Sequence, residues 1–138
     1  MLQDSATIES SFNRFVNRII EKERVFYLSN EDGVANSVSN KNEEITILMF
    51  WSDQAYATRA KGIFNEFYEE QEMELFSFLY QWLPGMTGDG VLAGPNWDSN
   101  LFGKEIEAFE LREFIESKMP SELLQKYTSK FEELTKEV

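Results

Sequence analysis

The sequence contains no cysteine and no histidine among its 138 residues. Without cysteine there can be no disulfide, thiolate nucleophile, iron–sulfur cluster or thiolate zinc site. Without histidine the chain lacks the commonest general base at neutral pH, so neither a Ser-His-Asp nor a Cys-His arrangement can exist. Any catalysis would have to use carboxylates, a lysine of lowered pKa, a tyrosine, or an oxygen-ligated Mg²⁺ or Ca²⁺.

Positive charge and long apolar runs are scarce as well. The chain carries 13 Lys and Arg against 25 Asp and Glu, and its formal net charge is -12, which argues against nucleic-acid binding. The longest nearly apolar run covers residues 45–51, whereas a membrane span needs ~20 residues. Residues 1–11 lack the pattern of a signal peptide. The sequence therefore predicts a cytoplasmic protein that binds neither nucleic acid nor membrane, and nothing in it indicates a cofactor or metal.

What the sequence does have is enough apolar material for a folded core. Hydrophobic residues make up 42% of the chain, and 12 of its residues are phenylalanine. Helix-period and strand-period segments are mixed along the chain, which predicts an α+β fold. We expect an antiparallel or mixed sheet of about four to six strands with helices packed on it. Residues 1–119 should form one domain, and residues 120–138 an amphipathic helix that packs on it or is used in dimerisation.

Apolar spacing predicts individual elements. It favours a helix over residues 6–22, strands at residues 25–28, 34–38 and 45–50, and a helix after Ser52 whose buried stripe extends to Phe67. The acidic residues from Glu66 to Glu74 are expected on a solvated helix face, before a short strand at residues 73–76. A further helix should end or bend at Pro84-Gly85.

Two stretches of sequence resemble a known family. One is Phe50-Trp51-Ser52-Asp53-Gln54-Ala55-Tyr56-Ala57. The other is Phe78-Leu79-Tyr80-Gln81-Trp82-Leu83-Pro84-Gly85-Met86, followed by Asp89-Gly90-Val91-Leu92-Ala93-Gly94 and Asn96-Trp97. Together they are similar to the DUF2750 family, and the resemblance covers about residues 8–118. It implies a small bacterial α+β domain, and it implies no catalytic residues because the family's function is unknown.

The loop at residues 95–102 is one candidate binding surface. It places Trp97, Asp98 and Phe102 among polar loop residues. Aromatic residues in loops are preferred anchors for partners. The main alternative for Trp97 is an indole that folds back over the core, because large aromatic side chains dominate burial energetics.

Charged clusters are the other candidates. In the acidic run, Glu69, Glu70 and Glu72 could receive a basic partner, or could simply be solvated. Arg14, Arg18 and Lys22 form a basic stripe on the first helix, which could bind an anion or pair with neighbouring carboxylates. The neighbouring carboxylates that could pair with this stripe are Glu9, Glu21 and Glu23. Candidates for carboxylate chemistry, near predicted strand ends and loops, are Asp89, Asp98 and Glu105.

These features favour a non-enzymatic protein-interaction module with a basic protein as its partner, acting as a monomer or homodimer. One alternative is an immunity or inhibitor protein that binds a basic toxin, for which the acidic charge would steer association. The other is a carboxylate-based, Mg²⁺-assisted enzyme, for which no nucleophile–base pair is present. The sequence leaves the question of enzymatic activity open.

Overall fold

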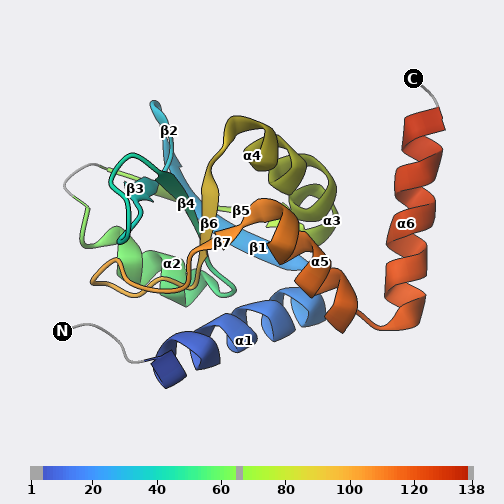
Figure 1. Ribbon diagram of the computed structural model, residues 1–138, viewed down its shortest axis with the longest axis horizontal. Coiled ribbons are helices and arrows are strands. Elements are labelled where there is room, and N and C mark those ends of the chain that lie inside the picture. Colours follow the sequence, from blue (N-terminus) through green and yellow to red (C-terminus); the bar gives the residue numbers. More distant parts are fainter. Residues whose placement is uncertain (1–4, 65–66, 137–138) are drawn as a thin grey trace.

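Residues 5–64 and 67–136 of the chain are described by a computed structural model (Figure 1). No helix in these ranges is both long and apolar enough to cross a membrane. The elements follow in the order α1 (Ser5–Lys22), β1 (Arg24–Asn30), β2 (Gly33–Val34), β3 (Asn36–Val38), β4 (Thr46–Phe50), α2 (Gln54–Lys61), β5 (Glu69–Glu74), α3 (Leu75–Ser77), η1 (Phe78–Trp82), α4 (Leu83–Asp89), β6 (Leu92–Pro95), β7 (Ile106–Glu107), α5 (Ala108–Lys118) and α6 (Ser121–Lys136).

The strands form two sheets that share one junction. One sheet has the order β2-β1-β5 and the other the order β3-β4-β6-β7, in which β4 and β6 are parallel and the other neighbours antiparallel. Phe26 of β1 and Trp51, just after β4, exchange backbone hydrogen bonds of 2.9 and 2.8 Å. The α+β prediction is therefore confirmed, with both antiparallel and parallel pairs present.

Two hydrophobic cores lie on opposite faces of the β1–β5 pair. Strand neighbours alternate between faces, so Val25 and Met73 enter one core while Leu28 enters the other. The first core contains the buried face of α1, whose predicted extent is confirmed, together with α3, α4 and α5. The second core lies under α2 and contains Trp51 and Trp97. Figure 1 shows α2 and α4 on opposite sides of the strands.

The acidic run forms a strand, so the prediction of a solvated helix face is wrong. Glu69–Glu74 is β5, an edge strand paired with Arg24–Ser29 of β1. Helix α2 ends at Lys61, earlier than its predicted stripe, and Phe67 is 65% exposed. Glu66 lies outside the described residues. The outer side of an edge strand can pair with another chain, and charged side chains oppose such pairing. An acidic sequence is therefore suited to this edge position.

The helix predicted to end or bend at Pro84-Gly85 continues to Asp89. It widens into a π-helical turn over Phe78–Trp82, where the N–H of Leu83 donates to the carbonyl of Phe78. Pro84 has no N–H to donate, and a local π-turn is a common way to accommodate such a break. The helix instead stops at Gly90, whose φ of 71° is left-handed and suits glycine. The predicted end at Pro84 is therefore wrong.

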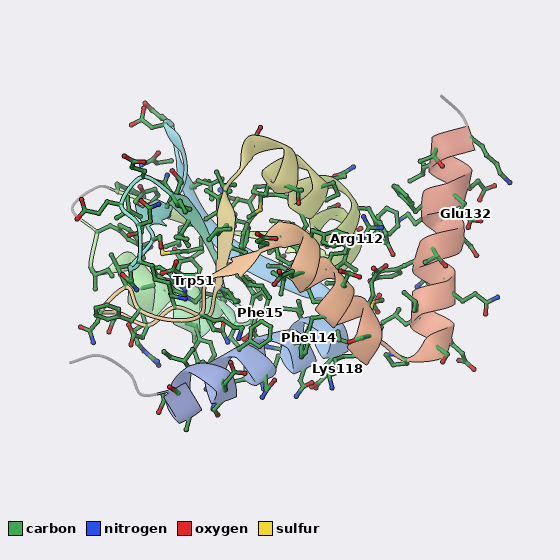
Figure 2. The ribbon with its side chains drawn as sticks, viewed as in Figure 1. Phe15, Trp51, Arg112, Phe114, Lys118 and Glu132 are labelled. Carbon is green, nitrogen blue, oxygen red and sulfur yellow. The ribbon has the colours of Figure 1, made fainter. Side chains whose placement is uncertain are left out.

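Helix α6 packs on its own domain through aromatic side chains. Tyr127 is buried, and the rings of Phe131 and Tyr80 stack with their centroids 4.8 Å apart. The Arg112 guanidinium lies 4.6 Å from the centroid of the Tyr80 ring, and Figure 2 shows it in the space between α5 and α6. The Tyr127 hydroxyl donates a 2.5 Å hydrogen bond to Glu23 Oε1. A role of α6 in dimerisation stays a prediction.

Removing that hydroxyl tests how firmly α6 is held. Burial and the Glu23 carboxylate both raise the pKa of Tyr127, so the hydroxyl remains a donor at neutral pH. We expect Tyr127→Phe to lower the free energy of unfolding by about 1–2 kcal/mol in urea titrations at pH 7. Tyr27→Phe is the control, because the described residues give its hydroxyl no hydrogen bond. Equal stabilities for the two variants would contradict the Tyr127–Glu23 contact.

Candidate functional site

The parallel strands β4 and β6 end at the same edge of their sheet. Their register pairs Phe50 with Pro95, and the N–H of Asn96 donates a 2.8 Å bond to the carbonyl of Phe50. The segments that follow, residues 51–53 and 96–98, therefore lie side by side. In open α/β sheets ligands bind outside the carboxyl ends of parallel strands, so this edge is the first place to look for a site.

Asn96 organises this edge. It is 7% exposed and has a φ of 50°, a left-handed conformation that asparagine tolerates better than most residues. Its Oδ1 accepts a 2.8 Å bond from the N–H of Ser52. Its Nδ2 donates to Ser52 Oγ at 3.1 Å and to the carbonyl of Ser11 at 3.4 Å. The side chain thus connects α1 to both strand ends, a role that no sequence pattern indicated.

Trp97 is 2% exposed, which confirms the interpretation that its indole folds back over the core. Its Nε1 donates a 2.8 Å bond to the carbonyl of Lys104, and its own carbonyl accepts a 2.9 Å bond from Trp51 Nε1. Gly94 and Gly103 lie against the ring, too close for a side chain of their own. The predicted binding role of Trp97 stays a prediction, and Trp97 is among the residues that line a cleft described below.

Asp98 and Phe102 shape the same loop but lie in different surroundings. Asp98 Oδ1 accepts backbone bonds from Asn100 at 2.8 Å and from Phe102 at 3.1 Å, which closes the loop. Asp98 lines the cleft beside Trp97. Phe102 is half-buried and lines a separate hollow that also contains Ile8. The structure therefore does not combine Trp97 and Phe102 into one exposed surface.

Asp53 pairs with two cations of the predicted basic stripe. Its carboxylate accepts bonds of 2.7 and 2.6 Å from Arg18 and one of 2.8 Å from Lys22. Partial burial would raise the pKa of Asp53, but the hydrogen bonds from Arg18, Lys22 and Ser52 outweigh it and hold that pKa well below its usual range. The stripe thus pairs across the fold with the start of α2.

Arg14, the remaining member of the stripe, lines a cleft between α1 and α2. The cleft has a volume of about 170 Å³. It lies at the carboxyl ends of β4 and β6, because its wall includes residues that directly follow both strands. Its lining includes Ser11, Arg14, Trp51, Arg59, Asn96, Trp97, Asp98 and Ser99.

The three predicted acidic residues of β5 do not act together. The Glu70 carboxylate accepts bonds from Lys61 at 2.6 Å and from Thr58 at 2.7 Å, and these lower its pKa. Glu72 shares a sheet face with Glu70 and is exposed, whereas Glu69 lies on the opposite face. Glu70 is thus paired inside the domain, while Glu69 and Glu72 are exposed, and their role in binding a basic partner stays a prediction.

A second hollow lies beside Glu69, at the tip of the β1–β2 hairpin. It has a volume of about 530 Å³, and its lining includes the carboxylates of Glu31, Asp32 and Glu69. Phe67 also lines it and is among the most exposed large apolar side chains of the described residues. Phe67 was not among the predicted site residues, because its spacing assigned it to the buried stripe of the helix after Ser52.

The carboxylates suggested for catalysis have separate surroundings. Asp98 lies in the cleft, and Glu105 accepts bonds from the Ser39 hydroxyl and, at 2.7 Å, from the N–H of Asn40. Asp89 is the exposed last residue of α4. Across residues 5–64 and 67–136, no group of three acidic side chains could hold a metal ion.

The fold and these sites define a small α+β domain with an arginine-lined cleft at the carboxyl ends of two parallel strands. The model of a family described as "Protein of unknown function (DUF2750)" matches residues 12–115. The chain therefore belongs to the DUF2750 family, as its sequence motifs predicted, and α6 lies outside the matched segment. No curated protein and no solved structure matches the chain.

Proposed function

We propose that this protein is a non-enzymatic interaction module that receives a basic segment of a partner protein at the Phe67 hollow. The observation that supports it most is the combination of an exposed aromatic ring with three carboxylates. Phe67 is 65% exposed, and Glu31, Asp32 and Glu69 line the same hollow. None of the residues that line it is a cation.

The chemistry of the hollow fits arginine or lysine side chains. A long basic side chain can lay its aliphatic stem on an aromatic ring while its charged head meets carboxylates. The same ring already attracts one cation of the protein itself, since Lys61 Nζ lies 6.0 Å from the centroid of Phe67. The net charge of -12 would speed the approach of a basic partner. An immunity or inhibitor protein against a basic toxin would be one form of this function.

Titration with a defined basic peptide tests this proposal. The probe is an extended peptide of alternating lysine and valine. It is added to the ¹⁵N-labelled protein, and the backbone N–H signals of the protein are followed by ¹⁵N–¹H NMR. We expect backbone shifts confined to the β1–β2 hairpin and β5, and a loss of affinity of about tenfold or more in Phe67→Ser. Shifts spread evenly over the surface would contradict the proposal.

A matched charge control separates a specific site from general acidity. Glu31→Lys/Glu69→Lys and Glu132→Lys/Glu133→Lys change the net charge by the same amount, and all four residues are exposed. Glu132 and Glu133 lie on α6, away from the hollow; Figure 2 labels Glu132 near its C-terminal end. Binding should weaken much more in Glu31→Lys/Glu69→Lys, because both carboxylates line the hollow. Equal weakening would show that only the overall charge matters, and the proposed site would be wrong.

A further inference from the structure

The cleft between α1 and α2 has two arginine side chains in its wall. Arg14 comes from α1 and Arg59 from α2. Within the described residues, neither has a carboxylate oxygen within 4.0 Å, whereas Arg18 is paired with Asp53. The Arg59 guanidinium lies 5.7 Å from the centroid of the Tyr56 ring, which supports it from one side. Two arginines therefore share one cleft, and in the part of the chain that the structure describes neither forms an ion pair.

The remaining wall combines two buried tryptophans with polar side chains. Trp51 is 1% and Trp97 2% exposed, and the hydrogen bond from Trp51 Nε1 to the carbonyl of Trp97 fixes one against the other. Asn96 joins the strand ends to α1 through its three hydrogen bonds, so the position of Arg14 relative to the strands is also constrained. Ser11 and Ser99 add hydroxyl groups that can donate to an anion.

We propose that this cleft binds the phosphate group of a small ligand. A guanidinium presents parallel donors that match two oxygens of an oxyanion, so one arginine can occupy both oxygens of a carboxylate. Two arginines and two hydroxyls match the larger number of oxygens on a phosphate. The volume of about 170 Å³ is smaller than the ~300–1,000 Å³ of pockets that enclose drug-sized ligands, so the cleft takes the phosphate and leaves the rest of the ligand outside.

Asp98 determines how tightly the site can bind. It lines the cleft, and its Oδ1 accepts two backbone N–H groups of its own loop. Its negative charge reduces the attraction that the two arginines exert on an anion. An asparagine at position 98 would keep a side-chain oxygen that accepts the two backbone N–H groups, and it would carry no charge. Asp98→Asn should therefore bind phosphate more tightly than the natural chain.

The three tryptophans provide an internal control for the test. Trp51 and Trp97 line the cleft, whereas Trp82 packs against Tyr27 with ring centroids 5.0 Å apart. The experiment follows the three indole N–H signals of the full chain by ¹⁵N–¹H NMR during titration with inorganic phosphate, with sodium chloride matching the ionic strength. We expect saturable shifts for Trp51 and Trp97 and none for Trp82. Absence of saturable shifts at ~10 mM phosphate, a concentration that detects a millimolar Kd, would overturn the proposal.

Charge-neutral variants identify the residues that bind. Arg14→Gln and Arg59→Gln should each weaken phosphate binding by about tenfold or more. Arg24→Gln is the matched control, because Arg24 is exposed and donates to the neighbouring carbonyl of Glu23 outside the cleft. Unchanged affinity in Arg14→Gln and Arg59→Gln, or equal weakening in all three variants, would overturn the proposal. An unshifted Trp82 signal shows that each variant is folded.

Acetate separates phosphate from carboxylate recognition. Acetate has fewer oxygen atoms than phosphate to accept bonds from the two arginines and two hydroxyls, so we expect it to bind more weakly. Tighter binding of acetate would overturn the assignment to a phosphate group. The residues lining this cleft and those lining the Phe67 hollow do not overlap. Failure of the phosphate titration would therefore leave the proposed interaction with a basic segment untouched, and the reverse also holds.

Discussion

Trp97→Ala is expected to lower the free energy of unfolding by about 3–5 kcal/mol, the usual cost of removing a large buried aromatic side chain. The indole is 2% exposed and donates its only N–H to the carbonyl of Lys104. Removing it empties part of the second core and leaves that carbonyl without its donor. Urea denaturation followed by circular dichroism measures the loss. A loss below about 1 kcal/mol would contradict the burial of Trp97.

Phe67→Ala is the control, because it removes an aromatic ring that is 65% exposed. Its effect should stay within about 0.5 kcal/mol, as for other surface positions. Trp97→Ala would reduce binding by unfolding the loop, so in the binding experiments it cannot test a contact surface. Phe67→Ser can serve as that test.

The close packing around the indole can be measured separately with Gly103. An added Cβ at Gly103 would overlap Trp97 Cδ1 and lie 3.0 Å from its Nε1. Gly103→Ala alone should therefore cost about 1–3 kcal/mol. In a Trp97→Ala background the same change has no ring to overlap and should cost much less. A double-mutant cycle gives the coupling, and purely additive effects would show that ring and glycine are not in contact.

Asp53→Asn is expected to produce the second large effect, a loss of about 1–3 kcal/mol at pH 7. The carboxylate accepts hydrogen bonds from both Arg18 and Lys22, and the amide keeps the shape while removing the charge. The side chains of the two cations are 39% and 36% exposed, so water recovers part of the loss. Glu70→Gln, which weakens a carboxylate paired with one cation instead of two, should cost less than about 1 kcal/mol.

The same pair makes stability sensitive to acid. Because the pKa of Asp53 is lowered in the folded protein from an ordinary value of 3.8, folding favours the ionised form. The stabilisation is complete well above pH 3.8 and is lost as the pH falls below it toward the folded-state pKa. The difference in stability between the natural chain and Asp53→Asn should therefore shrink between about pH 5 and pH 3. A difference that is constant over this range would contradict a charged Asp53.

The family, the fold class and the first helix could be predicted from the sequence because they depend on local patterns. The i, i+4, i+7 spacing of Ile8, Phe12 and Phe15 is a property of one segment. The prediction for the residues of strand β5 was wrong because their structure depends on a distant segment. Glu69–Glu74 carries little strand propensity of its own and is extended because β1 offers a hydrogen-bonding partner, which is a tertiary effect.

The sites were harder to predict because they combine distant segments. Asp53 and Arg18 are 35 positions apart, and Asn96 and Ser11 are 85 apart, so no spacing rule connects them. Sequence reasoning proposed local partners for the basic stripe, which are close along α1. The structure instead pairs Arg18 with the start of α2 and leaves Arg14 in the cleft.

The π-turn over Phe78–Trp82 also limits how this protein can change in evolution. Such a turn holds one residue more than a regular helix, so deleting one residue there would restore ordinary helical geometry. A deletion in the regular helix that follows, Leu83–Asp89, has no such extra residue to remove and would rotate the two parts of the helix relative to each other by ~100°. Tyr80, which contacts both Glu116 of α5 and Phe131 of α6, would then lose alignment with Met86 in the first core. Within this helix, the loss of one residue should therefore be tolerated best at the π-turn.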